Sequence, residues 1–329
     1  MGLEVNQVAA TETGIDMVLG DDDIAGWLTT HADEVGARLR RRGALLFRGF
    51  AVAEVDDFER VVGTVCPDDL SFSEESSPRS RVSDRVATST DYPARYPIQF
   101  HNENSYAYEW PLKLLFCCLQ PAANGGETVL ADSRRVLSRL RPETADLFAE
   151  RRILYARNYA PNLGVPWPKA FGTSDRAEVD EYCRSAGIET IWSDDRLQTR
   201  QVGDAIVVHP HTGERVWFNH ALLFNVLGLE PDWLREFMAR EPESARSSNS
   251  YFGDGEPIAD ALLEEIRDAY RAEAFSVEWQ RGDVLVIDNM LCAHGRAPYA
   301  GDRRVIVAMG ERVRREEVVS WRPTSVAPS

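Results

Sequence analysis

The chain has 329 residues, 43% of them hydrophobic, which is enough to bury the core of one large domain. Its 37 basic and 53 acidic residues give a formal net charge of −16, which opposes binding to nucleic acid or to an anionic membrane. No apolar run approaches the ~20 residues of a membrane span, and five scattered cysteines favour reduced thiols, so we expect a cytoplasmic protein.

The N-terminal third begins with helical patterns. Acidic residues at 21–23 can cap a helix that ends at Gly43, where an apolar strand begins. A second helix is predicted from Asp56 to just before Pro67. Residues 68–95 are rich in Ser, Arg and Pro without periodicity, which predicts a long loop. Because this loop leads directly into a segment with metal-binding residue types, we expect it to act as a lid.

That segment contains His101 and Glu103. On an extended strand, residues i and i+2 project to the same face, so both side chains can reach one ion. The triplet alone is weak evidence, since two residues of these types fall two apart by chance in many chains. The prediction becomes stronger because residues of related chemistry follow in order along the chain.

The middle of the chain combines strand and helix patterns. The apolar run 114–119 predicts a buried strand, and Asn124–Thr128 is a tight glycine turn that ends in a hydroxyl group. A helical stretch is expected over 132–151, interrupted by Pro142. Residues 155–280 are expected to form a helical insertion with short strands: helices at 175–186 and 257–272, with Pro257 in the first turn, and strands at 205–208, 216–218 and from 275.

A second histidine, His294, follows the apolar run Val284–Ile287, which predicts a buried strand that ends in a turn. Further on, Arg303 and Arg304 begin an alternating strand. A guanidinium binds a carboxylate bidentately, as a dicarboxylate co-substrate would require, but only one of two successive arginines can point inward. Two imidazoles and one carboxylate are the ligand set of a non-haem Fe(II) oxygenase, which leaves coordination positions free for a co-substrate and O₂.

These motifs together resemble the TauD/TfdA family of Fe(II)/2-oxoglutarate-dependent dioxygenases. Within it, the chain is most similar to SyrP-like enzymes of nonribosomal peptide pathways, a branch that also resembles clavaminate synthase. The shared segments extend over most of the chain and are collectively specific: Ser77–Arg79, Thr88–Thr90, His101–Tyr106, Gly125–Thr128, Ala131–Arg135, Val216–Asn219 and His294–Arg296.

The resemblance implies an iron site and a keto-acid site. His101, Glu103 and His294 match the catalytic Fe(II) ligands, with 2-oxoglutarate and O₂ as co-substrates. Thr128 and Arg304 match the residues that hold the distal carboxylate of the keto acid. The spacing from histidine to arginine is slightly short for the family, so Arg303 remains an alternative.

The resemblance also implies the architecture. We expect a double-stranded β-helix core, of jelly-roll or cupin-like type, at about 40–312, with flanking helices and the helical insertion. The whole chain, 1–329, would form one catalytic domain with a polar tail at 314–329.

The expected substrate is an amino acid, free or held on a peptidyl carrier protein, and the expected reaction is hydroxylation of an unactivated β carbon in natural-product biosynthesis. Arg79 would hold a substrate carboxylate, while Tyr106 and Phe218 would line the pocket. Taurine is not expected, because Ala308 replaces the arginine that grips the sulfonate in taurine dioxygenase. Halogenation is not expected, because the carboxylate ligand is present.

Several alternatives stay open at the level of sequence. His209 and His211 have ligand-like spacing, although the proline between them favours a turn. His220 can face the substrate or pack in the core, and Arg81 or Arg296 can replace Arg79 as a carboxylate partner. The same cofactors can give desaturation or cyclisation. A zinc hydrolase and a non-catalytic metal-binding β-barrel are alternatives from other classes.

Overall fold

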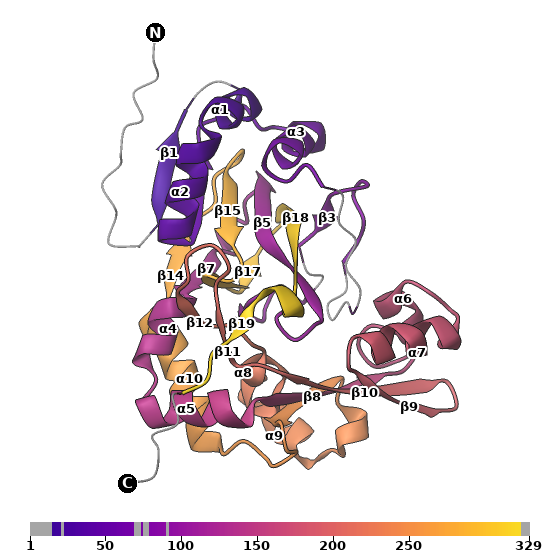
Figure 1. The fold of residues 1–329 in the computed structure, drawn as a ribbon. Helices are drawn as coiled ribbons and strands as arrows, with labels where there is room; N and C mark the ends of the chain where they lie inside the picture. The colour runs from indigo at the N-terminus through magenta and orange to yellow at the C-terminus, as the bar shows by residue number, and fades with distance from the viewer. Residues whose placement is uncertain (1–14, 21–22, 69–73, 75–78, 90–91, 324–329) are drawn as a thin grey trace.

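The structure is a computed structural model that describes residues 15–20, 23–68, 74, 79–89 and 92–323. Two sheets form the core (Figure 1). The first contains, in order, β1 (Asp16–Leu19), β2 (Ala44–Arg48), β15 (Val284–Asp288), β5 (Glu109–Gln120), β18 (Arg304–Arg314) and β3 (Ala87–Thr88). The second contains β14 (Phe275–Val277), β7 (Thr128–Asp132), β16 (Cys292–Arg296) and β4 (Ile98–His101).

The two sheets pack against each other through apolar side chains. Leu114 and Phe116 of β5 share one buried cluster with Leu130 of β7. Leu115 and Cys117, which alternate with them, pack in a second cluster with the N-terminal helices. Because successive residues of a strand face opposite sides, the apolar stretch 114–119 of β5 is buried on both faces. This arrangement agrees with the predicted double-stranded β-helix.

Helices α1 (Ile24–Thr30), α2 (Ala32–Arg42) and α3 (Val55–Val65) cover the outer face of the six-stranded sheet (Figure 1). Asp23 caps α1, and Gly43 ends α2 with a left-handed φ of 77°, as predicted. The single helix expected here is two helices. At His31 the backbone leaves the helical conformation, and the imidazole ring stacks on the Trp27 ring at 4.2 Å. The prediction for α3 is confirmed.

The expected helical insertion is a mixed α/β layer, so this prediction is corrected. Its sheet has the order β13 (Ser248–Phe252), β8 (Ile153–Tyr159), β10 (Arg196–Gly203) and β9 (Glu189–Ser193). This sheet was not predicted from the sequence because β9 and β10 lack an apolar run: β9 alternates between exposed and half-buried positions, and β10 mostly between buried and half-buried ones. The helices are α6 (Trp167–Phe171), α7 (Arg176–Ser185), α8 (Ala221–Phe224), α9 (Asp232–Arg240) and α10 (Asp260–Ala272). Figure 1 shows β8, β10 and β9 at the end of the molecule away from α1 and α3.

The remaining elements lie between the core sheets and the mixed α/β layer. Helices α4 (Ser133–Arg139) and α5 (Pro142–Arg151) are separated where Pro142 was expected to interrupt them. Smaller sheets consist of β12 (Arg215–Trp217), β11 (Ile206–Val208) and β19 (Val319–Ser320), and of β17 (Tyr299–Ala300) with β6 (Asn124–Gly125). Among the described residues, no helix is long and apolar enough to cross a membrane.

Two further expectations are corrected. Residues 314–323 are not a free tail, because β19 pairs with β11 at Val207 and Val208. Residues 324–329 lie outside the described residues. Helix α10 begins at Asp260 and not at Pro257. Much of the predicted lid, at 69–73, 75–78 and 90–91, also lies outside the described residues.

Candidate metal centre and adjoining cavity

Three side chains converge between β4 and β16. His101 and His294 are register partners on these antiparallel strands, and their ring centroids are 4.3 Å apart. With Glu103 they offer ligand atoms that all lie within 4.8 Å of one another. Within the described part of the chain, this is the one group of His, Cys, Asp and Glu side chains that could hold a metal ion. Two imidazoles and one carboxylate fit Fe(II).

Glu103 does not lie on the strand, so the predicted strand spacing of the two ligands is wrong. Strand β4 ends at His101, and Glu103 follows in a turn. Asn289 fixes this turn from the end of β15: its Oδ1 accepts from Glu103 N at 2.7 Å, and its Nδ2 donates to Glu103 O at 2.9 Å. No sequence pattern singles out Asn289, because its role depends on contact between residues 186 positions apart.

Both histidines are suited to ligation in the neutral form. The Nδ1 of His101 donates to Gln99 O at 2.8 Å, which leaves its Nε2 lone pair for the site. Burial lowers the pKa of His101, and burial together with the neighbouring His101 places the pKa of His294 well below its ordinary value. The buried Nδ1 of His294 has no hydrogen-bond partner among the described residues.

Arg79 compensates the carboxylate of Glu103. Burial by itself raises the pKa of Glu103, but the charge of Arg79, the neighbouring His101 and the hydrogen bond from Arg79 together outweigh it, so the pKa lies below its usual value. The Arg79 Nη2 lies 2.6 Å from Glu103 Oε2, and their side chains are 15% and 8% exposed. The predicted position of Arg79 at the site is therefore correct, but its partner in this structure is the candidate ligand itself.

A cavity adjoins the three candidate ligands and is rich in positive charge. Its walls include Arg79, Arg296 and Arg303 together with Thr128. The remaining lining residues are Ser89, Ile98, His101, Phe116, His294, Gly295, Val305 and Val307. No carboxylate lines this cavity among the described residues. An anionic ligand would therefore be stabilised there.

Arg303 is the inward arginine, so the predicted inward position of Arg304 is wrong. Arg303 shares its face of the strand with Val305 and Val307, which also line the cavity, whereas the side chain of Arg304 is exposed. Nε of Arg303 donates to Gly126 O at 3.0 Å, so this arginine lies against the glycine turn, whose two glycines have positive φ. Burial, and then the charge of Arg296, lower the pKa of Arg303 to about 10.

Thr128 also faces the cavity, as expected. Its Oγ1 accepts a hydrogen bond from Trp279 Nε1 at 3.2 Å, so the hydroxyl proton is available to an acceptor in the cavity. Arg296 differs from its two neighbours because its guanidinium donates to three backbone carbonyls, those of Tyr92, Pro93 and Tyr96. These hydrogen bonds from Arg296 hold the segment before β4 in place. The sequence did not indicate this role.

The two aromatic residues expected to line the pocket do not line this cavity. Phe218 packs in a separate apolar cluster with Trp110 and Met290, which contradicts its expected place at the site. Tyr106 is fully buried, and its hydroxyl donates to Glu74 O at 2.5 Å. The default role of large aromatic side chains, packing in the core, accounts for both.

His220 lies next to the candidate ligands. Its ring centroid is 6.1 Å from that of His101 and 4.9 Å from that of Tyr106. Its Nδ1 is 2.6 Å from Ser105 Oγ. Burial places the pKa of His220 well below its ordinary value, so this imidazole is neutral. Of the two roles left open by the sequence, packing in the core is the one that these contacts account for.

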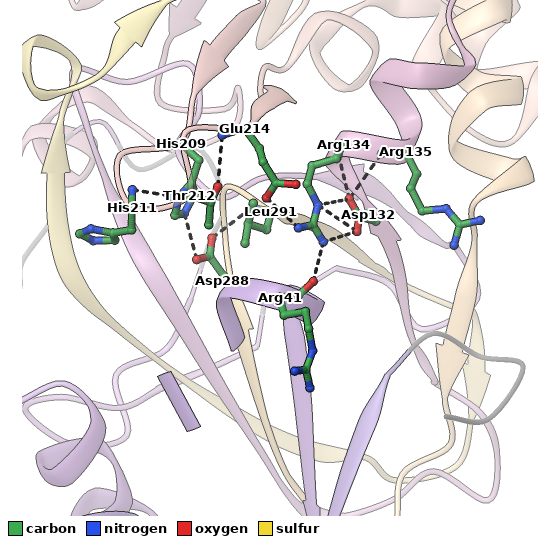
Figure 2. A network of polar contacts seen from close by, with 10 residues as sticks. All are labelled: Arg41, Asp132, Arg134, Arg135, His209, His211, Thr212, Glu214, Asp288 and Leu291. Carbon is green, nitrogen blue, oxygen red and sulfur yellow. Dashed lines mark hydrogen bonds and ion pairs between the residues drawn. The ribbon is translucent and has the colours of Figure 1, made fainter. Parts of the chain in front are cut away.

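His209 and His211 form a turn, as their sequence favoured. Figure 2 shows His209 between this turn and Asp288. The Nδ1 of His209 accepts from the backbone N–H groups of His211 and Thr212, and its Nε2 donates to Asp288 at 3.0 Å. Asp288 also accepts from Met290 N and Leu291 N. These bonds shape the turn between β15 and β16, and so support the strand that carries His294.

The fold and the site define a jelly-roll protein with a two-histidine, one-carboxylate centre beside an anion-binding cavity. The family model of the taurine catabolism dioxygenase TauD, TfdA family, matches residues 10–309, and the chain belongs to this family. It is an Fe(II)- and 2-oxoglutarate-dependent dioxygenase.

Individual proteins that are similar to this chain support the family assignment. The dapdiamide synthesis protein DdaC of Enterobacter agglomerans is 37% identical over 82% of this chain and 83% of its own length. The clavaminate synthase-like protein At3g21360 of Arabidopsis thaliana is 30% identical over 86% of each chain. The crystal structure of PvcB from Pseudomonas aeruginosa has the same fold, with a TM-score of 0.55 and 14% identity, covering 94% of this chain and 88% of PvcB.

Proposed function

We propose that this dioxygenase hydroxylates an unactivated carbon, the β carbon, of an amino acid or of an aminoacyl group held on a carrier protein, in natural-product biosynthesis. The observation that carries the proposal is the position of the three candidate ligands beside a cavity with three arginines and no lining carboxylate among the described residues. Similarity to a protein of dapdiamide synthesis supports a biosynthetic role.

In this proposal His101, Glu103 and His294 hold the iron ion. When bound, iron and 2-oxoglutarate would supply the oxidising power of the reaction. One oxygen atom of O₂ would enter succinate as the keto acid loses CO₂, and the other would enter the hydroxyl group of the product. The contribution of the chain is geometric. The neutral imidazoles and the ionised Glu103 present their lone pairs from a rigid strand pair and an Asn289-fixed turn.

Arg303 and Thr128 would hold the distal carboxylate of the keto acid. Arg303 replaces the expected Arg304 in this role, because it is the arginine that lines the cavity. Among the described residues, its Nη1 has only a long contact, 3.4 Å, with Ser89 Oγ, so it retains donor capacity for a carboxylate. The Thr128 hydroxyl would donate from the facing strand. Gly126 makes room: a Cβ there would lie 3.0 Å from Arg303 Cδ.

A screen for succinate formation tests the proposed reaction. The iron-loaded protein would be supplied with 2-oxoglutarate and either free amino acids or aminoacyl groups on a carrier-protein thioester. The expected result is succinate formed in equal amount to a product that is one oxygen atom heavier than the substrate. A product that is lighter than the substrate by two hydrogen atoms would contradict hydroxylation. A new double bond in that product would indicate desaturation, and a new ring would indicate cyclisation. Absence of product from every amino-acid-like substrate would contradict the substrate class.

A further inference from the structure

The guanidinium of Arg79 forms an ion pair with the candidate carboxylate ligand, Glu103. Its Nη2 lies 2.6 Å from Glu103 Oε2, and this same oxygen lies 3.9 Å from Nε2 of His101. The oxygen that faces the histidine is therefore the one already bound by a cation. A short charge-assisted bond of this kind is the strong type of hydrogen bond.

Within the part of the chain that the structure describes, most of the hydrogen-bonding capacity of Arg79 is unused. A guanidinium has five N–H donors, but the one contact of Arg79 Nη1 with these residues is to Met309 Sδ at 3.6 Å, a weak acceptor. Its Nε is buried and has no partner among the described residues. Arg79 also lines the cavity. A buried, under-bonded guanidinium is costly unless a second acceptor completes its bonds.

A metal ion and Arg79 compete for one carboxylate. A divalent cation bound to Glu103 would be close to the guanidinium, and like charges at short range inside a protein repel strongly. We propose that Arg79 takes the place of the metal ion on Glu103 in the metal-free protein, that metal binding displaces it, and that the freed guanidinium then binds a carboxylate of the substrate. The last part rests on the proposed function.

The charges of the site favour a substrate carboxylate as the new partner of Arg79. The two negative charges of a bound keto acid cancel the two positive charges of the metal ion. The positive charge of the cavity arginines is therefore still in excess when both are bound. Arg303 is assigned to the keto acid, and both terminal nitrogens of Arg296 donate to backbone carbonyls, which holds its guanidinium in place. Among the described residues, Arg79 is then the cavity arginine whose terminal Nη1 has no strong acceptor, so its guanidinium has the donors for a substrate anion.

Mn(II) binding to the metal-free protein, measured by calorimetry at about pH 8 so that carboxylates are ionised, tests the displacement. We compare the wild type with Arg79→Met, which keeps an unbranched, flexible side chain and removes the guanidinium and its charge. The expected result is Mn(II) binding at least about ten-fold tighter in the variant, because no ion pair has to be broken. Unchanged or weaker binding would overturn the displacement and leave Arg79 as a group that only orients Glu103.

The control is Arg81→Met, two residues further on. Arg81 pairs with Asp84 on the surface, with side chains 73% and 91% exposed, so its loss is expected to leave Mn(II) affinity within about two-fold. If Arg79→Met does not fold, Arg79→Gln serves instead. The neutral amide still donates to Glu103 but does not repel the ion, so tighter binding is again expected, and weaker binding would overturn the proposal.

A second titration addresses the freed guanidinium. The affinity of 2-oxoglutarate for the Mn(II)-loaded protein is expected to stay within about two-fold in Arg79→Met, because Arg303 and Thr128 hold the keto acid. A loss of about ten-fold or more would assign Arg79 to the keto acid and overturn its role toward the substrate. Since the first titration uses Mn(II) alone, its result does not depend on whether the proposed reaction is correct.

Discussion

Two regions of this molecule contain a histidine beside a carboxylate, and they differ in how fully their polar atoms are bonded. In the turn held by His209, both ring nitrogens are used, and Asp288 accepts from the imidazole and from two backbone N–H groups. At the candidate metal centre, buried donors and acceptors of His294, Arg79 and Arg296 have no partner among the described residues. The same residue types thus build a scaffold where they satisfy one another and a binding site where they do not.

The largest expected effect comes from the candidate ligands. Replacing His101 or His294 by Ala should reduce turnover by at least about a thousand-fold, because iron cannot be held by two ligands in the required geometry. Fe(II) binding and succinate formation would be measured together. A variant that lost neither would remove its histidine from the site, while loss of the folded near-UV circular dichroism would show that the effect was on folding.

The scaffold histidine should behave in the opposite way. His209→Ala leaves the buried Oδ2 of Asp288 and two partly buried backbone N–H groups without a partner, and should lower the free energy of unfolding by about 3 kcal/mol. Chemical denaturation of the metal-free protein measures this. The matched control is His211→Ala, whose imidazole is half exposed and should matter by no more than about 0.5 kcal/mol. If His209→Ala and His211→Ala lowered the free energy of unfolding equally, the structural role of His209 would be contradicted.

The arginine pair offers a similarly sharp contrast between neighbours. Arg303→Ala should raise the 2-oxoglutarate concentration needed for half-saturation about a hundred-fold, because it removes a guanidinium from the cavity. Arg304→Ala removes an exposed side chain and should change it by less than about two-fold. The reverse order of effects would restore the assignment that the sequence favoured.

The smallest expected effect is on pH dependence. Burial lowers the pKa of His101, His220 and His294 in the folded chain, so below about pH 6.5 the unfolded chain binds protons that the folded chain does not. The metal-free protein should therefore lose stability as the pH falls from about 6.5 to about 5.5, by up to about 1 kcal/mol for each imidazole. Thermal unfolding across this range tests it. A melting temperature that rises as the pH falls would contradict buried neutral imidazoles.

The motifs along the chain indicated the site because they are local and ordered. His101, Glu103 and His294 could be selected by residue type and by the apolar strands around them, and Thr128 by the glycine turn before it. The residues that support them were not predictable in the same way. Asn289 and Trp279 contact the site across 186 and 151 positions, and no short-range pattern records such contacts.

The choice between Arg303 and Arg304 shows a second limit. Strand alternation correctly said that only one could point inward, but it could not say which, because both faces of β18 are apolar and buried. The face is set by packing: Val305 and Val307 pack toward the second sheet with Leu130, and Arg303 alternates with them on the same side. The opposite choice would satisfy the same alternating pattern, so the pattern carries no signal for the inward face.

The fold was predictable where periodicity was strong and unpredictable where tertiary contacts decide. The apolar strands at 44–47, 114–119 and 284–287 were found because they are buried on both faces. The sheet of the insertion was missed because β9 is partly exposed along its length, and β19 because its two residues gain strand structure only by pairing with β11.

The central claim is tested most directly by anaerobic visible spectroscopy of the Fe(II)-loaded protein during titration with 2-oxoglutarate. The account predicts a metal-to-ligand charge-transfer band in the wild type and in Arg304→Ala, no band in His101→Ala, and a band that needs about a hundred-fold more keto acid in Arg303→Ala. No band in the wild type, or a band unaffected by loss of His101, would contradict the assignment of this centre.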